Sequence, residues 1–285
     1  MVIPVNGLRA GVGPAAGHPT VARRPRRGRP GSPWRRRRRA IIGVGVAIGL
    51  WAVITGSGAV STDNIPTVAA VVRGAAGSWQ DLLSSLGATL ESWALGLAIA
   101  TVAGATLGLL VGLSQWADSA TDVIVRMMRP LPSLALIPLA ILVAGLGVKM
   151  TSGLVAFAAF WPVFINSRYA VRQIEPRLLD SGRAVGLGRW GLIRRVVIPA
   201  TGPAIATGVR ISVGLAIVVT VSVELVVGTG GLGGYVLAAE QSGATGQMYA
   251  GVVVGGILGW VLNLLFLAAA RALMPWQAAA GRGLG

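Results

Sequence analysis

The sequence contains no cysteine and only one histidine, His18. Without cysteine, the chain can form neither disulfides nor cysteine-ligated metal sites. Because the only histidine is near the N-terminus, a histidine zinc site or a Ser-His-Asp triad is excluded from the rest of the chain. Lys149 is the sole lysine, and Met150 follows it, so the phosphate-binding pattern Gly-x-x-x-x-Gly-Lys-Ser/Thr is absent. The chain therefore has no visible means of hydrolysing ATP itself.

Charged residues are also scarce, at 12% of the chain, whereas 54% of the residues are hydrophobic. The mean hydropathy of +0.72 is far from that of a soluble domain. Several apolar runs reach ~20 residues, the length that a helix needs to cross a bilayer. The composition therefore predicts an all-α, polytopic membrane helical bundle.

The net charge of +16 is concentrated at the N-terminus, where eleven arginines lie between Arg9 and Arg39 with no acidic residue. Residues 1–39 lack apolar periodicity, and we expect a disordered cytoplasmic tail. The run Arg35 to Arg39 adjoins the first apolar segment, which indicates a topology-setting cluster that also contacts anionic lipid. An arginine-rich arm for nucleic acid is the alternative. Adjacency to a membrane span favours the lipid interpretation, so no nucleic-acid partner is expected.

Six transmembrane helices are expected within one transmembrane domain at residues 40–274, followed by a short tail at 275–285. The expected spans are 40–55, 86–113, a third reaching 146, 152–166, 204–227 and 248–273. The third span is expected to begin before Pro130 and to be broken there and at Pro132 and Pro138. Broken spans often border a transport pathway, because their backbone groups need partners from neighbours or cavity water. Residues 115–129 are expected to form a polar connection.

Within the second span Ala100, Gly104, Gly108 and Gly112 recur every four residues. Such a face of small residues allows another helix to approach closely. The alternative is simple tolerance of glycine in membrane helices. The pattern favours a packing face.

Arginine asymmetry sets the expected orientation. With the N-terminus inside and six spans, the inner segments hold nearly all arginines, including seven from Arg168 to Arg195. The outer segments hold only Arg73 and Lys149. This distribution follows the positive-inside rule and predicts a multi-pass protein of the cell membrane with both termini in the cytoplasm.

Residues 175–203 form a polar, arginine-bearing segment between two apolar runs, and it falls on the cytoplasmic side. It predicts two short helices hinged at Gly186 and Gly188, since glycine permits a sharp turn. The second helix is expected to present Trp190, Ile193 and Val197 on one face. Pro199 and Pro203 are expected to end it, because proline cannot continue a helix.

Glu224 is the one acidic residue deep in an apolar run. Ionisable residues there are costly and suggest a pathway or a pairing role; the alternative is a residue at the outer interface. The sequence GTGGLGG at 228–234 follows it and is interpreted as a flexible turn. Residues 235–247 are expected to lie outside the membrane.

The polar segment at 175–203 also resembles a known motif. Asp180-Ser181-Gly182, then Gly186, then a hydrophobic ending at Ile198-Pro199, resembles the cytoplasmic loop of ATP-binding-cassette importer permeases. That family usually begins the motif with Glu-Ala-Ala, so this sequence keeps the acid and the small residues only. The alternative is an ordinary amphipathic surface loop.

Further segments resemble the nitrate, sulfonate and taurine branch of this family: 129–147, 160–166, and Glu224 with the glycines after it. The resemblance implies a second permease copy, a separate ATPase subunit that binds ATP, and an extracytoplasmic solute-binding protein, with no cofactor in this chain. It implies ATPase coupling through Asp180, Ser181, Gly182, Gly186, Trp190, Ile193, Ile198 and Pro199. The broken third span and the intramembrane acid predict a translocation pathway that involves Glu224, Pro132 and Pro138.

Two other functions are compatible with a polytopic membrane protein. A gradient-driven secondary transporter would need intramembrane acids or histidines or an inverted repeat, and the sequence offers little beyond Glu224. A membrane enzyme would need a nucleophile with a base, or metal ligands, and neither is evident. The resemblance therefore favours a non-enzymatic importer subunit, whose solute the sequence does not identify.

Overall fold

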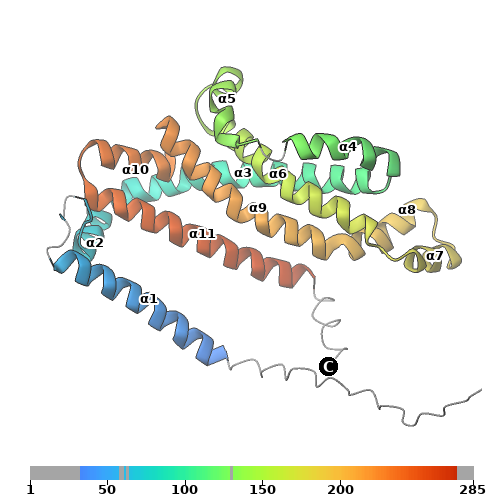
Figure 1. Ribbon diagram of the computed structural model, residues 1–285, viewed down its shortest axis with the longest axis horizontal. Helices are drawn as coiled ribbons and strands as arrows, with labels where there is room; N and C mark the ends of the chain where they lie inside the picture. Colours follow the sequence, from blue (N-terminus) through green and yellow to red (C-terminus); the bar gives the residue numbers. More distant parts are fainter. Residues whose placement is uncertain (1–32, 58–60, 62–63, 129–130, 275–285) are drawn as a thin grey trace, which may run out of the picture. The chain divides into compact units, whose positions relative to one another are not determined.

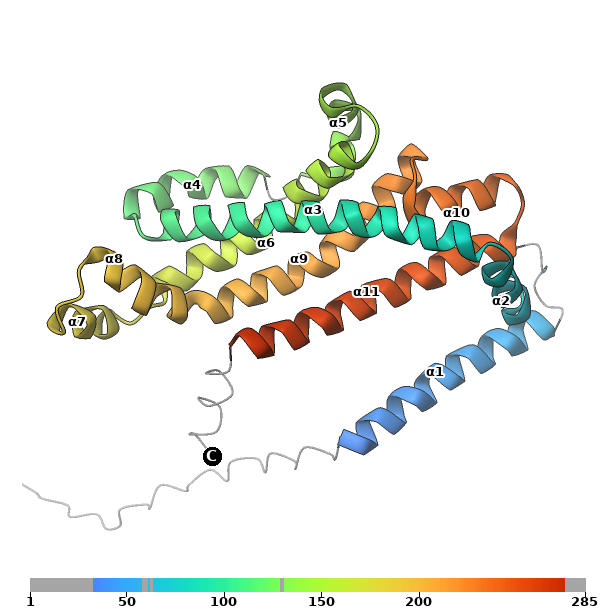
Figure 2. The same cartoon turned by 180° about the vertical axis from the view of Figure 1, so that it is seen from behind.

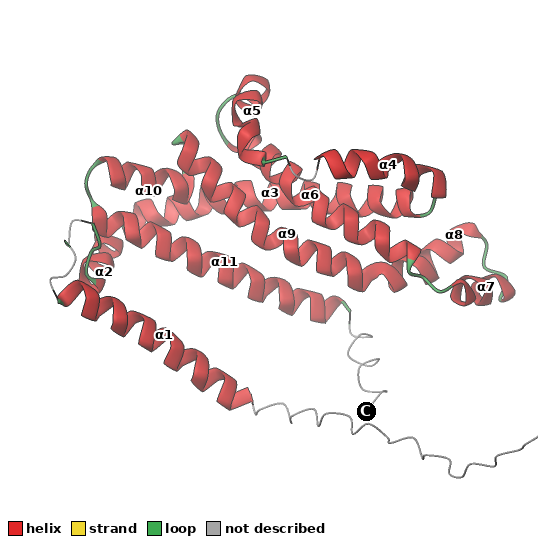
Figure 3. Ribbon diagram, viewed as in Figure 1, coloured by secondary structure: helices red, strands yellow, loops and turns green. Residues whose placement is uncertain are grey.

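The computed structural model describes residues 33–57, 61, 64–128 and 131–274, and within these residues the secondary structure is entirely helical (Figure 3). The chain divides into two compact units, residues 1–47 and 48–285. The described part of the first unit is the beginning of α1 (Pro33–Gly56), whose side chains from 41 to 47 are exposed. The tail expected to be disordered through residue 39 therefore overlaps α1, because proline suits a first helical turn and arginine is a good helix former. Residues 1–32 and 275–285 lie outside the described residues.

The second unit contains the remaining helices (Figure 1). In chain order they are α2 (Val68–Gly77), α3 (Trp79–Gly112), α4 (Gln115–Met128), the 3₁₀ helix η1 (Ser133–Leu136), α5 (Ile137–Ala144), α6 (Val148–Arg172), α7 (Pro176–Ala184), α8 (Arg189–Leu192), the π-helix η2 (Ile193–Val197), α9 (Ile198–Val227), α10 (Gly231–Gln241) and α11 (Thr245–Leu273).

Helix α6 is the centre of this unit and packs along both α3 and α9 (Figures 1 and 2). One buried apolar cluster joins these helices with α5 and includes Val155, Ala159 and Val223. A second cluster joins α3, α9, α10 and α11 around Leu232, which is fully buried. The two clusters hold the helical bundle together through apolar contacts and close backbone approach.

The face of small residues on α3 packs against α6, as its spacing predicts. Ala100 is 1% exposed. A Cβ atom added at Gly104 would lie 2.9 Å from Val163 Cβ, and one at Gly108 would lie 2.6 Å from the carbonyl oxygen of Phe164. A side chain at these positions would force the helices apart, so the glycines set the distance between α3 and α6.

Four described helical segments are long and apolar enough to cross a membrane: Trp79–Gly112, Val148–Arg172, Arg189–Val227 and Thr245–Leu273. The pair Gln115–Met128 and Ser133–Ala144 adds a fifth if the bent pair is one span. The expected first span corresponds to Ile41–Gly56, which is shorter than the ~20 residues that a straight crossing needs. The expected count of six is therefore approximate.

The third expected span differs from its prediction. The polar connection expected at 115–129 forms helix α4 over residues 115–128, and one face of this helix buries Val125 and an ion-paired Asp118. Pro138 lies in the first turn of α5 and does not interrupt it, since the first helical turn does not require the missing N–H. Pro132 precedes η1 in an extended conformation.

The turn expected at 228–234 is shorter than predicted: residues 228–230 form it, and the residues from Gly231 are helical. Gly231 begins α10, which packs on α3, α9 and α11. Gly231 has φ +91°, and a Cβ at Gly233 would collide with the backbone of α9 at Val221 and Leu225. The glycines allow α10 to fold back tightly on the end of α9, so residues 235–241 belong to the packed unit.

The predicted helix end at Pro199 and Pro203 is also wrong, because α8, η2 and α9 form one continuous helical segment from Arg189 to Val227. Pro199 lies in the first turn of α9, directly after the π-helical turn, and Pro203 lies inside α9. Ile198 N–H donates to Ile193 C=O across the wider turn. Local π geometry of this kind accommodates a proline and its missing donor inside a helix.

Candidate functional site

The loop between α6 and α9 turns at Gly186, as its sequence predicts. Two backbone hydrogen bonds close the C-terminal end of helix α7. Gly186 N–H donates to Arg183 C=O at 2.9 Å, and Leu187 N–H donates to Gly182 C=O at 3.1 Å. These two bonds define a Schellman motif, which requires a left-handed residue at the first position beyond the helix. Gly186 has φ +82° and fills that position. Gly188 has φ −67°, so its backbone does not require glycine.

Gly182 lies where α7 contacts the second part of the loop. It is buried, and a Cβ at this position would lie 3.0 Å from Leu192 and 3.4 Å from Val196. Asp180 and Ser181 are exposed on the other side of α7, and Asp180 pairs with Arg183 at 3.1 Å. Of the acid and small residues of the motif, only the glycine therefore has a packing role within this chain.

The predicted apolar face of the second loop helix is not formed. Trp190 is 74% exposed, Ile193 is half-buried and Val197 is 2% exposed. The π turn at 193–197 adds a residue to the helical turn and rotates the residues after it relative to those before it. Val197 therefore packs inside the chain, whereas Trp190 remains available to a partner.

A hollow of about 540 Å³ lies at this turn. It is lined by the glycine-rich turn at 186–188 together with Trp190, Gly191, Arg194 and Arg195. Ile198 and Pro199, at the start of α9, are exposed. The loop thus offers an exposed indole and two guanidinium groups around one concave surface, on a segment continuous with α9.

Glu224 lies at the meeting point of three helices and is 2% exposed. Its Oε2 accepts hydrogen bonds from Thr89 Oγ1 of α3 at 2.8 Å and from Gly233 N–H of α10 at 3.1 Å. Thr89 Oγ1 in turn accepts from Leu232 N–H at 2.8 Å. Buried polar groups need such partners, so this carboxyl group holds the first turn of α10 against α3 and α9.

The residues predicted for a pathway lie in different places. Pro132 lines a hollow of about 410 Å³ between η1, α6 and α9, together with Trp161 and Asn166. Glu224 lines a smaller hollow of about 70 Å³ with Ser92, Thr151 and Thr229. Pro138 is exposed on α5.

An ion-pair cluster with a buried centre was not foreseen from the sequence; Asp118 and Arg168 are its buried members, and Asp122 and Arg172 are its more exposed members. Arg168 Nε pairs with Asp118 Oδ1, and Arg172 Nη1 pairs with Asp118 Oδ2. Arg168 Nη2 also donates to Asp118 C=O at 3.1 Å and to Asp122 Oδ1 at 3.3 Å. The sequence does contain a signal for this cluster. Asp118 and Asp122 are four residues apart on α4, and Arg168 and Arg172 are four residues apart on α6, so each helix presents two like charges on one face.

We expect Glu224→Gln to keep the packing and lower transport. The amide oxygen of glutamine can accept both hydrogen bonds, whereas Glu224→Ala leaves Gly233 N–H without an acceptor, at a cost of about 1–3 kcal/mol. An ionisable group that lies inside a span favours a role of the charge in transport. Thermal unfolding in detergent and uptake at equal membrane abundance measure the two effects. Glu240→Gln on exposed α10 surface is the control, and uptake by Glu224→Gln equal to wild type would contradict the role of the charge.

Comparison with known proteins assigns the chain to a family. The family described as "Binding-protein-dependent transport system inner membrane component" matches residues 100–278. A putative aliphatic sulfonates transport permease of Bacillus subtilis, SsuC, is 29% identical over 81% of this chain and 85% of its own. The taurine transport system permease TauC of Escherichia coli is 32% identical over 70% and 71%. The nitrate import permease NrtB of Leptolyngbya laminosa is 30% identical over the same shares.

Solved structures share the fold. An amino acid ABC transporter chain covers 70% of this chain and 95% of its own length, with a TM-score of 0.53 and 18% identity. A chain of the methionine ABC transporter MetNI, in an inward-facing conformation, covers 73% and 98%, with a TM-score of 0.52 and 22% identity. The family match and the relatives agree with the loop motif and disfavour a gradient-driven transporter. The chain belongs to the binding-protein-dependent inner-membrane component family and is a permease subunit of an ABC importer, not an enzyme, in the nitrate, sulfonate and taurine branch.

Proposed function

We propose that this permease imports a small solute that carries an oxyanion group, of the class named for its sulfonate, taurine and nitrate relatives. Two copies of the chain form the pathway, and an extracytoplasmic solute-binding protein delivers the solute. A separate ATPase subunit binds ATP, so this chain needs no cofactor. Both termini and the loop at 175–203 lie in the cytoplasm, in agreement with the arginine distribution.

The geometry of the loop at 175–203 supports its proposed role in coupling the permease to the ATPase subunit. Trp190 projects as an exposed aromatic residue beside the hollow lined by Arg194 and Arg195. Exposed aromatic and arginine side chains are the residue types enriched at binding hot spots. Because α8 continues through η2 into α9, a displacement of the docked loop reaches the transmembrane region as a movement of one helical segment.

Cysteine labelling tests both the orientation and the docking. The chain has no native cysteine, and Ser61, Ser181 and Ser242 are exposed. We expect a membrane-impermeant thiol reagent to label Ser61→Cys and Ser242→Cys in intact cells, but not Ser181→Cys. In inside-out vesicles the pattern reverses, and co-expression of the ATPase subunit slows labelling at 181.

Two outcomes of this experiment separate the parts of the proposal. Labelling of Ser181→Cys in intact cells would overturn the orientation. Unchanged labelling of Ser181→Cys in inside-out vesicles that contain the ATPase would leave the orientation intact and count against docking at α7.

A further inference from the structure

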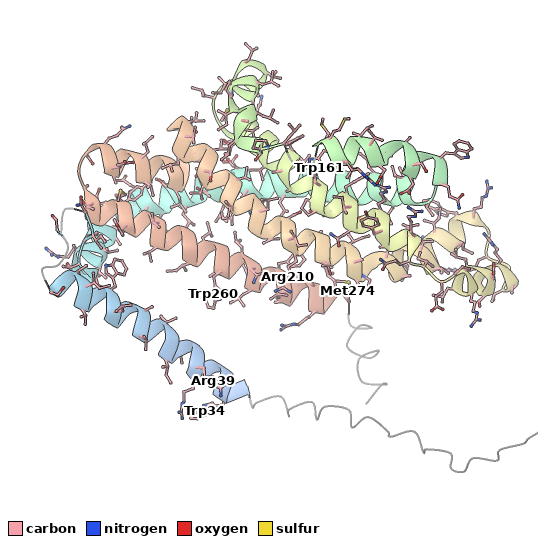
Figure 4. All side chains as sticks on the ribbon, in the orientation of Figure 1. Trp34, Arg39, Trp161, Arg210, Trp260 and Met274 are labelled. Atoms are coloured by element: carbon pink, nitrogen blue, oxygen red, sulfur yellow. The ribbon has the colours of Figure 1, made fainter. Side chains whose placement is uncertain are left out.

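A hollow of about 500 Å³ opens between α9 and α11, and neither Glu224 nor the residues around Trp190 line it. Arg210 of α9 and Arg271 in the last turn of α11 both line it. Its walls also include the apolar side chains of Phe266, Leu267 and Met274. Figure 4 shows Arg210 and Met274 on these two neighbouring helices.

The side chains of Arg210 and Arg271 enter the hollow from its two ends and point toward each other. A Cβ at Gly202 would lie 3.7 Å from Met274 and one at Gly259 would lie 3.6 Å from Ile217, so α9 and α11 run antiparallel. Helical side chains tilt toward the N-terminus of their own helix. The α9 arginine therefore leans toward the end of α11, and the α11 arginine leans back along α11 toward it.

Within the part of the chain that the structure describes, no acidic side chain neutralises this pair. Among the described residues, no carboxylate lies within ion-pair distance of Arg210 or Arg271. The chain segments outside the described ends cannot supply one, because residues 1–62 and 241–285 contain no aspartate or glutamate. Two like charges that share one hollow repel each other, and the repulsion is relieved when an anion binds between them.

We infer that this hollow binds one phosphate-class oxyanion between Arg210 and Arg271. Guanidinium groups present paired N–H donors that match the oxygens of a phosphate. Thr207 also lines the hollow, but its hydroxyl donates to Pro203 C=O at 3.0 Å, so the two guanidinium groups supply the donors for the oxyanion. The oxyanion is either the headgroup phosphate of an anionic phospholipid or a free anion from solution.

The level of the site in the membrane matches that of a lipid phosphate group. Roughly 26 Å of helix separates Arg210 from Val227 at 1.5 Å per residue. The hydrocarbon core of a bilayer is about 30 Å thick, so Arg210 lies near its boundary if Val227 lies near the opposite one. Basic hollows between transmembrane helices at this level bind anionic headgroups, while the apolar wall residues can contact the glycerol and acyl chains.

The test uses the purified full chain in a neutral detergent. We expect dioctanoyl phosphatidylglycerol to raise the melting temperature of the wild type more than dioctanoyl phosphatidylcholine does, because a ligand of the folded state stabilises it. The double variant R210Q/R271Q should require about tenfold more phosphatidylglycerol for the same shift, since it loses both charged donors. Inorganic phosphate forms a third arm, and a comparable shift with phosphate identifies a soluble oxyanion as the ligand.

The control variant R73Q/R177Q removes the same charge from two exposed arginines outside the hollow and should respond like the wild type. The single variant R271Q, at an exposed position in the last helical turn, keeps the test valid if the double variant does not fold. Native mass spectrometry of bound phosphatidylglycerol gives an independent readout. Equal responses of the wild type, R271Q and the double variant, or an equal loss in the control, would overturn the site.

Discussion

Replacing Asp118 with asparagine is expected to destabilise the chain by up to about 3–5 kcal/mol, because it removes the buried charge partner of Arg168 and leaves only the 3.3 Å contact with the partly exposed Asp122. Asp118 is 4% exposed and Arg168 is 3% exposed. The carboxylate accepts from Arg168 and from Arg172, so one substitution removes charge from two of the three ion pairs between α4 and α6. Thermal or denaturant unfolding of the detergent-solubilised chain measures the loss.

The exposed pair Asp180 and Arg183 provides a matched control. Both side chains are about two-thirds exposed, and their shortest distance is 3.1 Å. Exposed pairs contribute about 0–1 kcal/mol, so Asp180→Asn should change the stability little. Equal effects of Asp118→Asn and Asp180→Asn would contradict the role assigned to the buried cluster.

Substituting both Asp118 and Arg168 shows whether a single substitution destabilises the chain by leaving a charge unpaired or by removing packing contacts. Replacing both members of a buried ion pair with apolar residues is often neutral or stabilising, because no charge is then left without a partner. D118L/R168L should therefore be more stable than either D118L or R168L alone. If the double variant loses as much as the sum of the two single variants, the side chains act independently and the pairing contributes nothing.

The sequence predicts features that depend on local geometry. The spacing of Gly104 and Gly108 predicts a close helix contact, and the structure places α6 there. The glycine at 186 predicts a turn, and its backbone is left-handed. Each of these conclusions rests on residues within one or two helical turns, where the chemistry of the chain alone restricts the conformation.

Features that join distant residues could not be derived in this way. Thr89 and Glu224 are 135 residues apart, and only the packed structure makes them partners. The π turn at 193–197 has no signal in the apolar spacing, so the predicted face of Trp190, Ile193 and Val197 failed there. Prolines in the sequence indicate a missing donor, but the neighbouring geometry decides whether a helix ends or adapts.

The second large effect is expected at the turn of the loop. Gly186→Val places a β-branched residue at φ +82°, a backbone conformation that costs an L-residue about 1–2 kcal/mol or more. A Cβ at this position would meet no atom within 4 Å, so the penalty comes from the backbone and not from a collision. The Schellman turn should open, and α7 should lose its fixed angle to α8 while the transmembrane helices remain intact.

Two variants separate this backbone effect from the mere addition of a side chain. Gly186→Asn should retain function, since asparagine tolerates the left-handed conformation. Gly188→Ala should also retain function, because Gly188 has φ −67° and open space around its Cβ position. Both add atoms to the same hollow beside Trp190, so loss of function in all three variants would indicate a surface effect.

We expect Gly186→Val to reach the membrane in normal amounts and to fail in coupling. A change of about 1.4 kcal/mol corresponds to a tenfold change in an equilibrium, so the docked loop conformation should be populated roughly tenfold less. Co-purification with the ATPase subunit, stimulation of ATP hydrolysis by loaded binding protein, and uptake should fall together. Because the turn contacts no solute, the affinity of the binding protein for solute should not change. Normal stimulation and normal uptake in Gly186→Val would show that the movement of the ATPase reaches α9 by another part of the chain.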